Sequence, residues 1–356
     1  MTLTLSIDTS RWREHQESIL RQFPELVPVC KGNGYGFGQQ RVAQETARLG
    51  VRLLAVGTPY EAAQIQDIFS RDVLILTPYR RGEESVPLSH RIIRTVASVE
   101  GARDLAGTRT VVKLMSSMRR HGVTEQDLPA LSAAVKNLRC AGFSLHLPLN
   151  RANTSDAMAE VITWIDCLRS AGLSPRTFFV SHLGVDELAR LRQQFLDTDF
   201  RLRVGTRLWL GGHQVAEYRS TVLNVVRVVA GERFGELQRR AVSDGHLVVV
   251  AGGTSHGIGL RAPRTLRGVL PRVRHMTGAG RAAVNRHLFP FFYAGERCRF
   301  AEPPHMHESV LFVPAEQPPP RVGESLVARV RYTTTRPDRV VERSSPVYPS
   351  GLPAQR

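Results

Sequence analysis

The first 210 residues alternate short apolar runs with amphipathic segments, and this alternation limits the possible folds more than any other sequence feature. Residues 27–30, 52–56 and 72–76 are predicted strands, whereas 40–49 and 59–69 have the spacing of one-sided helices. Further strands are expected at 92–96, 109–114, 141–145, 177–181 and 201–204, with helices at 156–171 and 185–195. Alternating strands and helices imply a parallel sheet covered by helices. Their number favours a closed α/β barrel of the TIM-type (β/α)8 class over an open sheet.

The pattern changes after about residue 215, where strands become dense and helices scarce. The predicted strands there cover 220–229, 247–251, 310–313 and 325–332, which indicates a C-terminal all-β domain. A chain of 356 residues also fits two domains better than one core. We therefore expect a barrel domain at 1–214, with the option that its first strand packs with the second domain. A β-domain at 215–345 and a loose tail at 346–356 would follow.

The net charge of +16 would suit a protein that binds nucleic acid. The arginines, however, are spread along the whole chain, and no RNA- or DNA-binding motif accompanies them. We interpret the charge as an arginine-rich solvated surface and expect no nucleic-acid partner.

Features of a membrane or secreted protein are missing from the sequence. No apolar run reaches the ~18 residues that a membrane span needs, and the first residues do not have the pattern of a secretion signal. The four cysteines are scattered without a CxxC pair, which suits a reducing compartment. A cytoplasmic protein without a membrane partner is expected.

Lysine is rare in this chain, which contains only Lys31, Lys113 and Lys136. Because arginine does not release its proton, a retained lysine hints that an amine was required. Lys31 ends the first predicted barrel strand and opens a glycine-rich turn, at the strand end where TIM barrels place their active sites. A partly desolvated lysine near cations can attack an aldehyde. A surface lysine in a glycine-rich turn explains the spacing equally well.

Five segments, in order, resemble motifs of the alanine racemase family, whose members are fold-type III pyridoxal-phosphate enzymes. CKGNGYGFG at 30–38 resembles the cofactor-lysine motif K-A-x-A-Y-G-H-G, and VKLMSSMRRHGV at 112–123 resembles L-K-x-D-T-G-M-x-R-x-G. GFSLH at 142–146 resembles G-x-x-T-H, and RVGTRLWLG at 203–211 resembles R-x-G-I-x-x-Y-G. GTSHG at 253–257 stands where the family has G-Y-A-D-G. The resemblance covers most of the chain and implies a divergent member.

The resemblance implies a role for each matching barrel residue. Lys31 would hold pyridoxal 5'-phosphate as a Schiff base and serve as one acid/base, and Tyr35 would hold the phosphate. Lys113 matches a lysine that is often carbamylated and pairs with an arginine, here Arg120. Arg120 would contact the phenolic oxygen of the cofactor and the substrate. His146 would lie against the pyridine ring, although by itself it could be an ordinary core histidine.

Three further matches concern the cofactor's ring nitrogen and phosphate. Arg203 would donate to the pyridine nitrogen, which limits the cofactor as an electron sink and suits racemisation better than transamination. Gly205 and Thr206 would offer donors to the phosphate. Ser181 is a weaker phosphate candidate, because its spacing to Arg203 is longer than in the family.

The second acid/base of the family is a tyrosine, supplied by the β-domain of the partner subunit, and Thr254 stands at its place here. An unactivated threonine hydroxyl is a poor base near neutral pH. His256 replaces the aspartate of the motif and has a reference pKa of ~6.5. We hypothesise that His256 carries this proton transfer.

A second departure lies at 303–308, where the sequence is PPHMHE and the family has C-M-D-Q. Met306 matches the methionine, and His305 and Met306 would contact the substrate. A His-x-His pair on one strand face can also bind a metal, through His305 and His307. D-threonine aldolase and D-serine dehydratase use a comparable pair in their β-domains. We favour histidines without a metal.

The expected function is therefore a pyridoxal-phosphate-dependent amino-acid racemase of D-amino-acid metabolism, which interconverts L- and D-amino acids. The resemblance further implies a head-to-tail homodimer with shared active sites. A metal-assisted D-amino-acid lyase or dehydratase and a catalytically silent pyridoxal-phosphate-binding protein are the alternatives. Because MSS at 115–117 replaces the usual Asp-Thr-Gly, the amino acid is left open. Tyr332 is a guess for the family's C-terminal phosphate-binding tyrosine.

Overall fold

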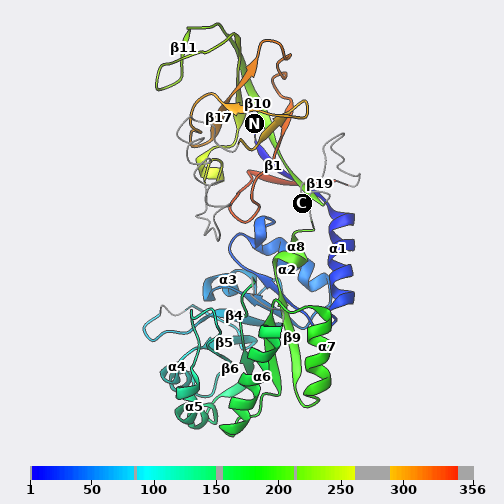
Figure 1. Cartoon of the computed structure of the whole chain (residues 1–356), viewed down its shortest axis with the longest axis vertical. Coiled ribbons are helices and arrows are strands. Elements are labelled where there is room, and N and C mark those ends of the chain that lie inside the picture. Colours follow the sequence, from blue (N-terminus) through cyan, green and yellow to red (C-terminus); the bar gives the residue numbers. More distant parts are fainter. Residues whose placement is uncertain (1, 84–85, 150–154, 212–214, 261–288, 344–356) are drawn as a thin grey trace. The chain divides into compact units, whose positions relative to one another are not determined.

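A computed structural model of the chain describes residues 2–83, 86–149, 155–211, 215–260 and 289–343 (Figure 1). The chain divides into two compact units, and each is described by itself. One unit is Glu14–Leu210, and the other joins Met1–Arg13 to Gly211–Arg356. The expected tail at 346–356 lies outside the described residues.

The unit Glu14–Leu210 contains the closed parallel barrel of eight strands that the sequence predicts. The barrel closes because its first strand pairs in parallel with both the second and the last. The strands are β2 (Val27–Cys30), β3 (Leu53–Val56), β4 (Asp72–Pro78), β5 (Ile92–Val96), β6 (Arg109–Lys113), β7 (Arg139–Ser144), β8 (Thr177–Ser181) and β9 (Asp199–Val204). Alternate residues of these strands meet in a buried cluster that includes Val27, Val29, Leu53, Ala55, Leu74, Ile93, Val111 and Phe179. The short apolar runs therefore fill the barrel with branched and aromatic side chains.

Helices follow the barrel strands, and local capping explains where several of them begin (Figure 1). α3 begins after Thr58, whose hydroxyl accepts from the Glu61 amide, with Pro59 in the first turn. Ser98 caps α4 in the same way. The helices are α1 (Thr9–Gln22), α2 (Gln39–Arg48), α3 (Pro59–Ile65), α4 (Val99–Asp104), α5 (Leu128–Val135), α6 (Ser155–Ser170), α7 (Val185–Gln194) and α8 (Thr206–Trp209). Short 3-10 turns are η1 (Gly34–Gly36), η2 (Glu125–Asp127) and η3 (Thr254–His256).

The other unit is built on a nine-stranded sheet, which confirms the predicted C-terminal β-domain. β15, β14, β18, β10, β13, β17 and β16 lie in this order, and β1 pairs with β10 and β19. These strands are β1 (Leu3–Asp8), β10 (Ala216–Val228), β13 (Gly245–Ala251), β14 (Phe291–Tyr293), β15 (Glu296–Arg297), β16 (Arg299–Phe300), β17 (Glu308–Pro314), β18 (Ser325–Ala328) and β19 (Arg339–Arg343). A separate two-stranded sheet contains β11 (Arg233–Phe234) and β12 (Arg239–Arg240).

The first strand pairs within this sheet, antiparallel to β10 and parallel to β19. For this reason the first thirteen residues group with the C-terminal unit, which agrees with the option given for the first strand, and the later break lies at Leu210/Gly211, near the expected 214/215. Within the described residues, no helix has the length and apolar character that a membrane crossing requires.

Candidate active site

Lys31 directly follows β2, at the carboxyl end of the barrel strands, and the next residues form a tight turn. Gly32 and Gly34 have φ of 64° and 61°, a region that favours glycine. The Asn33 side chain accepts from the Gly36 amide at 2.9 Å, and Gln39 donates to the Gly32 carbonyl at 2.8 Å. The glycine-rich motif therefore folds into a hydrogen-bonded turn that presents Lys31 at the barrel mouth.

Cationic side chains from other strand ends surround Lys31. Partial burial lowers its pKa first, and Arg120 and Arg203 lower it further, whereas Glu61 opposes them. Burial also lowers the pKa of Lys113, to about 8, with help from Arg203, Arg120 and Lys31. The structure thus brings together the two lysines and two arginines that the sequence separates. Such a cluster favours neutral amines and attracts an anionic ligand.

Arg120 lies on the loop that follows β6, and two side chains of α6 hold this loop. Glu160 accepts from the Ser117 amide at 2.7 Å and from its hydroxyl at 2.9 Å. Trp164 donates to the Met115 carbonyl at 3.0 Å. A Cβ at Gly122 would lie 2.2 Å from the backbone of Leu114, so only glycine fits where the loop returns. Residues 115–117, which replace the family's Asp-Thr-Gly, are therefore held in place by hydrogen bonds to Glu160 and Trp164.

His146 follows β7, and the Ser181 side chain contacts its ring. The Ser181 hydroxyl lies 2.9 Å from His146 Nδ1 and accepts from the Leu147 amide at 3.1 Å. A hydroxyl has one proton to donate and two lone pairs, so Ser181 can accept from the amide and also pair with Nδ1, whichever nitrogen carries the proton of the neutral ring. Burial, then Arg203 and His182, lower the pKa of His146 to about 3, so the ring is neutral near pH 7.

Ser181 is buried, and its hydroxyl already has these two partners. The phosphate contact suggested for it would compete with both, and it stays a prediction. The geometry instead describes a residue that orients His146.

Arg203, at the end of β9, carries a buried polar atom with an open bonding position. One terminal nitrogen donates to the Leu145 carbonyl at 2.9 Å. Its Nε is buried and has no hydrogen-bond partner among the described residues. Burial lowers the pKa of this guanidinium to about 10, still far above neutral pH. A buried N–H without an acceptor is unfavourable, so a ligand atom with a lone pair fits here.

Tyr35 reaches the loop after β9, the eighth strand of the barrel. A Cβ at Gly205 would lie 1.9 Å from the Tyr35 hydroxyl, so the phenol rests against the Gly205 backbone. Thr206 follows and begins α8. Burial raises the pKa of Tyr35, and Cys30 and Glu61 raise it further, which keeps the hydroxyl protonated as a donor. TIM barrels commonly bind phosphate at the loops after their last two strands.

These features fit pyridoxal phosphate. The cofactor needs an amine, an anion-binding region and a partner for its ring nitrogen, and the barrel offers Lys31, the cationic cluster and Arg203 Nε. Tyr35, Gly205 and Thr206 lie together as the three predicted phosphate contacts.

Two residues at this barrel end were missed by the sequence analysis. Glu61 accepts from the Gly32 amide, and its Thr58-x-x-Glu61 capping box was readable in the sequence. His182 follows β8 with a φ of 57°, and its ring centroid is 5.3 Å from that of His146. Its sequence position gave no comparable signal.

In the β-domain, the two segments that depart from the family motifs lie side by side. The Thr254 amide donates to the His305 carbonyl at 2.8 Å, and the Ser255 amide donates to the Met306 carbonyl at 3.0 Å. A Cβ at Gly253 would lie 2.1 Å from the His305 carbonyl oxygen, which explains the glycine. The segments 253–257 and 305–307 are therefore neighbours held together by backbone hydrogen bonds.

His256 has partners on both ring nitrogens and is 8% exposed. Its Nε2 lies 3.0 Å from Asp338 Oδ1, and its Nδ1 accepts from the Gly253 amide at 3.2 Å. Because the amide can only donate, the proton of the neutral ring lies on Nε2, toward the carboxylate. This is the geometry of a histidine that holds a turn. Its proposed proton transfer remains a prediction.

His305 and His307 have separate partners. His305 Nε2 lies 2.8 Å from Glu302, and this bond raises the pKa of His305. His307 Nδ1 lies 3.3 Å from the Ser255 hydroxyl, and its ring is edge-on to His256 at 5.9 Å. In the described parts of the chain, no three His, Cys, Asp or Glu side chains are grouped so as to hold a metal ion.

Met306 and Tyr332 are the other two candidates in this unit. Met306 is 66% exposed and available for a contact. The Tyr332 hydroxyl donates to the Ala216 carbonyl at 2.5 Å, and its ring packs edge-on against Tyr218. The hydroxyl of Tyr332 is therefore already engaged, and phosphate binding by Tyr332 stays a prediction.

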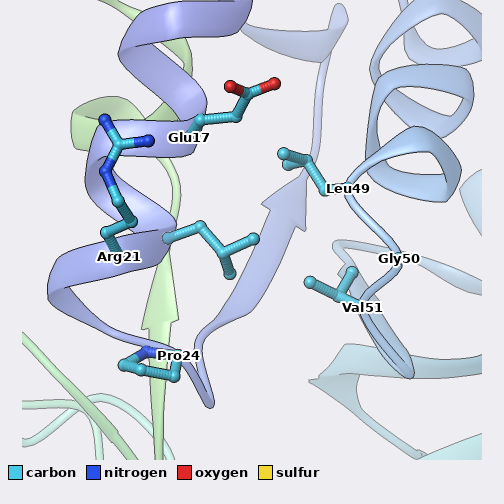
Figure 2. A pocket seen from close by; sticks show the side chains of 7 residues that line it. Glu17, Arg21, Pro24, Leu49, Gly50 and Val51 are labelled. Atoms are coloured by element: carbon cyan, nitrogen blue, oxygen red, sulfur yellow. The ribbon is translucent and has the colours of Figure 1, made fainter.

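A surface hollow lies elsewhere on the barrel unit, between α1 and the segment that precedes β3 (Figure 2). Its lining consists of Glu17, Leu20, Arg21, Pro24, Leu49, Gly50 and Val51. Pro24 and Val51 precede their strands, so the hollow is at the amino end of the barrel strands, opposite Lys31. That end contributes to stability in TIM barrels, and we assign it no chemistry.

Comparison with known proteins shows the family of the chain. The family model "Alanine racemase, N-terminal domain" matches residues 7–199, more than half of the chain. Alanine racemase of Nitratidesulfovibrio vulgaris is 31% identical over 128 residues, 33% of this chain and 34% of the relative. Alanine racemase of Campylobacter concisus is 28% identical over 153 residues, 40% of this chain and 44% of the relative. These matches span about a third to less than half of the relatives' length.

Solved structures resemble the chain over nearly its whole length. The alanine racemase of Bacillus anthracis with bound L-Ala-P has a TM-score of 0.71 at 16% identity, covering 98% of this chain and 96% of that one. The alanine racemase of Bartonella henselae, with covalently bound pyridoxal phosphate, has a TM-score of 0.70 at 14% identity, covering 96% and 100%. At such identities the likeness concerns the fold. Together with the matched family model, it shows that this chain belongs to the alanine racemase family.

Proposed function

We propose that this protein is a pyridoxal-phosphate-dependent amino-acid racemase that interconverts L- and D-amino acids by removing and returning the α-proton. The observation that carries the proposal is the cluster of Lys31, Lys113, Arg120 and Arg203 around a neutral His146. Burial, and then the arginines, lower the pKa values of Lys31 and Lys113, which favours the neutral amines that nucleophilic and basic chemistry requires. Pyridoxal phosphate, when bound, supplies the electron-withdrawing ring that makes the α-hydrogen of an amino acid acidic.

Lys31 is the proposed attachment residue, and its amine exchanges a proton with one face of the substrate. Arg203 would donate its unpartnered Nε–H to the ring nitrogen of the bound cofactor. Because arginine keeps its proton, it leaves that nitrogen unprotonated, which favours proton return over transamination. His146, oriented by Ser181, would lie against the pyridine ring.

Tyr35, Gly205 and Thr206 are the proposed phosphate contacts, with the Tyr35 phenol as a neutral donor. Arg120 and Lys113 are expected at the phenolic side of the cofactor. Arg120 is also a candidate for the carboxylate of the amino acid, since a guanidinium binds carboxylates bidentately.

The acid/base for the opposite face is proposed to come from the β-domain of a second subunit in a head-to-tail homodimer. Thr254 and His256 are the candidates, and His305 and Met306 would contact the substrate. Their support is that the Thr254 and Ser255 amides donate to the His305 and Met306 carbonyls, which places the two segments side by side. The four free cysteines agree with a cytoplasmic location, which is part of the proposal.

A second candidate function is a protein that binds pyridoxal phosphate without turnover. One observation favours it: both nitrogens of His256 are already occupied, and Thr254 replaces the expected tyrosine. Thus neither candidate for the opposite face is a free base in this structure.

Absorbance and labelling test cofactor attachment. We expect the purified protein to absorb at about 420 nm, as a lysine-attached pyridoxal cofactor does. Borohydride reduction and peptide mapping should place the label on Lys31 rather than on Lys113 or Lys136. A colourless protein that takes up no cofactor would refute the proposal.

Exchange of the α-hydrogen with solvent deuterium then separates the functions. A racemase incorporates deuterium while optical activity is lost. Bound cofactor without exchange on any D- or L-amino acid identifies the silent binding protein. Release of a ketoacid or aldehyde, sensitive to chelators, would identify a lyase.

A further inference from the structure

Glu61 is the third residue of α3 and closes the capping box at its start. Its Oε2 accepts from the Gly57 amide at 2.6 Å and from the Thr58 amide at 3.2 Å. The Thr58 hydroxyl in turn accepts from the Glu61 amide at 3.2 Å. These bonds satisfy amides at the helix start, and a capping box needs no more than this from its glutamate.

The other carboxylate oxygen leaves the capping box and reaches the turn that carries Lys31. Glu61 Oε1 accepts from the Gly32 amide at 2.7 Å, and Gly32 is the residue after Lys31. β2 and β3 are paired up to Cys30 and Val56, so this carboxylate ties the two strand ends together just beyond the last paired residues. Charge-assisted bonds to backbone amides are among the stronger hydrogen bonds.

Gly57 shows how closely these groups approach one another. A Cβ built there would lie 2.6 Å from Glu61 Oε2 and 3.4 Å from the Lys31 Cβ. The stem of Lys31 and the carboxylate therefore approach the same glycine. A side chain at residue 57 would push the carboxylate away.

We propose that Glu61 is a positioning residue that holds the Lys31 turn against the end of β3 and supplies the negative charge opposing the surrounding cations. The importance of Glu61 for catalysis rests on the proposed function of Lys31. The claim that Glu61 positions the Lys31 turn does not depend on that function.

The charges that face Lys31 set the direction of the effect. Arg120 and Arg203 disfavour its protonated form, whereas Glu61 favours it. Loss of the Glu61 charge should therefore lower the pKa of Lys31. Glu61 also lies near Tyr35 and Cys30, which are neutral near pH 7 because their pKa values are raised.

The test uses the cofactor-free full-length chain and reads the amine directly. The rate of Lys31 acylation by acetic anhydride is measured against pH by peptide mass spectrometry, with exposed Lys136 as internal reference. In Glu61→Gln we expect the Lys31 midpoint to fall by about 0.5 to 1 pH unit, the range for a nearby, partly solvated charge. Lys136 should not shift.

Glu187 offers a matched control. It occupies the same capping position on α7 and accepts from the Gly184 amide at 2.6 Å, at another strand end. Glu187→Gln should lower the midpoint of thermal unfolding, because the helix loses a capping interaction. It should leave the titration of Lys31 unchanged. If Glu61→Gln behaves like Glu187→Gln, Glu61 is only a helix cap and the proposal is wrong.

A second variant keeps the test decisive if Glu61→Gln does not fold. Glu61→Asp keeps the charge but is too short to hold Gly32 and α3 at once. We expect the Lys31 midpoint to shift by less than about 0.3 units, since the charge remains nearby. Hydrogen exchange of the Gly32 amide should become at least tenfold faster. Unchanged protection of Gly32 would overturn the positioning role. Because the cofactor is absent, a failure of the racemase proposal leaves these outcomes interpretable.

Discussion

Replacing Gly205 by alanine should push Tyr35 out of its place at the barrel mouth. The new Cβ would lie 1.9 Å from the Tyr35 hydroxyl oxygen and 2.6 Å from its ring carbon Cζ. To reach an ordinary contact of about 3.5 Å, the phenol must move by about 1.6 Å. Tyr35 is only 7% exposed, so its neighbours must move too. Overpacking of this kind costs about 1–3 kcal/mol.

Urea denaturation of the cofactor-free protein measures this cost. Gly184→Ala is the control, because a Cβ there meets only Glu187 Oε2 at 3.5 Å and the backbone is extended. It should change the free energy of unfolding by less than about 0.5 kcal/mol. In a Tyr35→Phe background the atom at 1.9 Å is gone, so the Gly205→Ala cost should shrink by about 1 kcal/mol. Equal costs in both backgrounds, within about 0.3 kcal/mol, would show that the two residues do not touch.

The same variants report on phosphate binding. Loss of one hydrogen bond to a charged group is worth about 1.5 kcal/mol or more, so Gly205→Ala and Tyr35→Phe should each weaken pyridoxal phosphate binding about tenfold. Pyridoxal without the phosphate should bind all of them alike. A parallel loss for both ligands would refute the assignment of Tyr35 and Gly205 to the phosphate.

Three further perturbations test the neighbouring groups. Lys113 has a folded-state pKa of about 8, below its reference value of 10.5, so its charge destabilises the fold at low pH and this cost fades from about pH 8 to 10.5. Urea midpoints should therefore rise with pH more in the wild type than in Lys113→Met; parallel pH profiles would contradict the buried charge. Ser181→Ala should destabilise the cofactor-free protein by about 1–3 kcal/mol, because His146 and the Leu147 amide lose a buried partner, whereas a pure phosphate ligand would leave that stability unchanged. His256→Ala should abolish α-deuterium exchange while the cofactor stays bound, and unchanged exchange in a folded variant would rule out its catalytic role.

The pattern of strands and helices in the sequence predicted the barrel and the β-domain, and the ordered motifs predicted the candidate site residues. This was possible because barrel strands and helices have local signatures. The apolar run at 72–76, for example, became β4 at Asp72–Pro78. The order of Lys31, Lys113, His146 and Arg203 along the chain also followed the strand ends that bring them together.

The domain boundary was harder, because the partners of the first strand are remote in sequence. β1 pairs with residues 216–220 and 339–343, and local periodicity carries no information about such distant pairings. The boundary near 214 was predicted to within a few residues, whereas the packing of the first strand with the β-domain was therefore given only as an option.

The sequence alone determined which residue types stand at the strand ends of this barrel, and hence the chemistry that the site can support. Only the tertiary structure decided which of their atoms are already occupied. Ser181 is bound to His146, His256 is bound to Asp338, and Glu61 reaches the Lys31 turn. The physical reason is that a side chain's hydrogen bonds depend on which loops the closed barrel and the folded sheet place beside it. Residues that are tens of positions apart become neighbours only when those structures form.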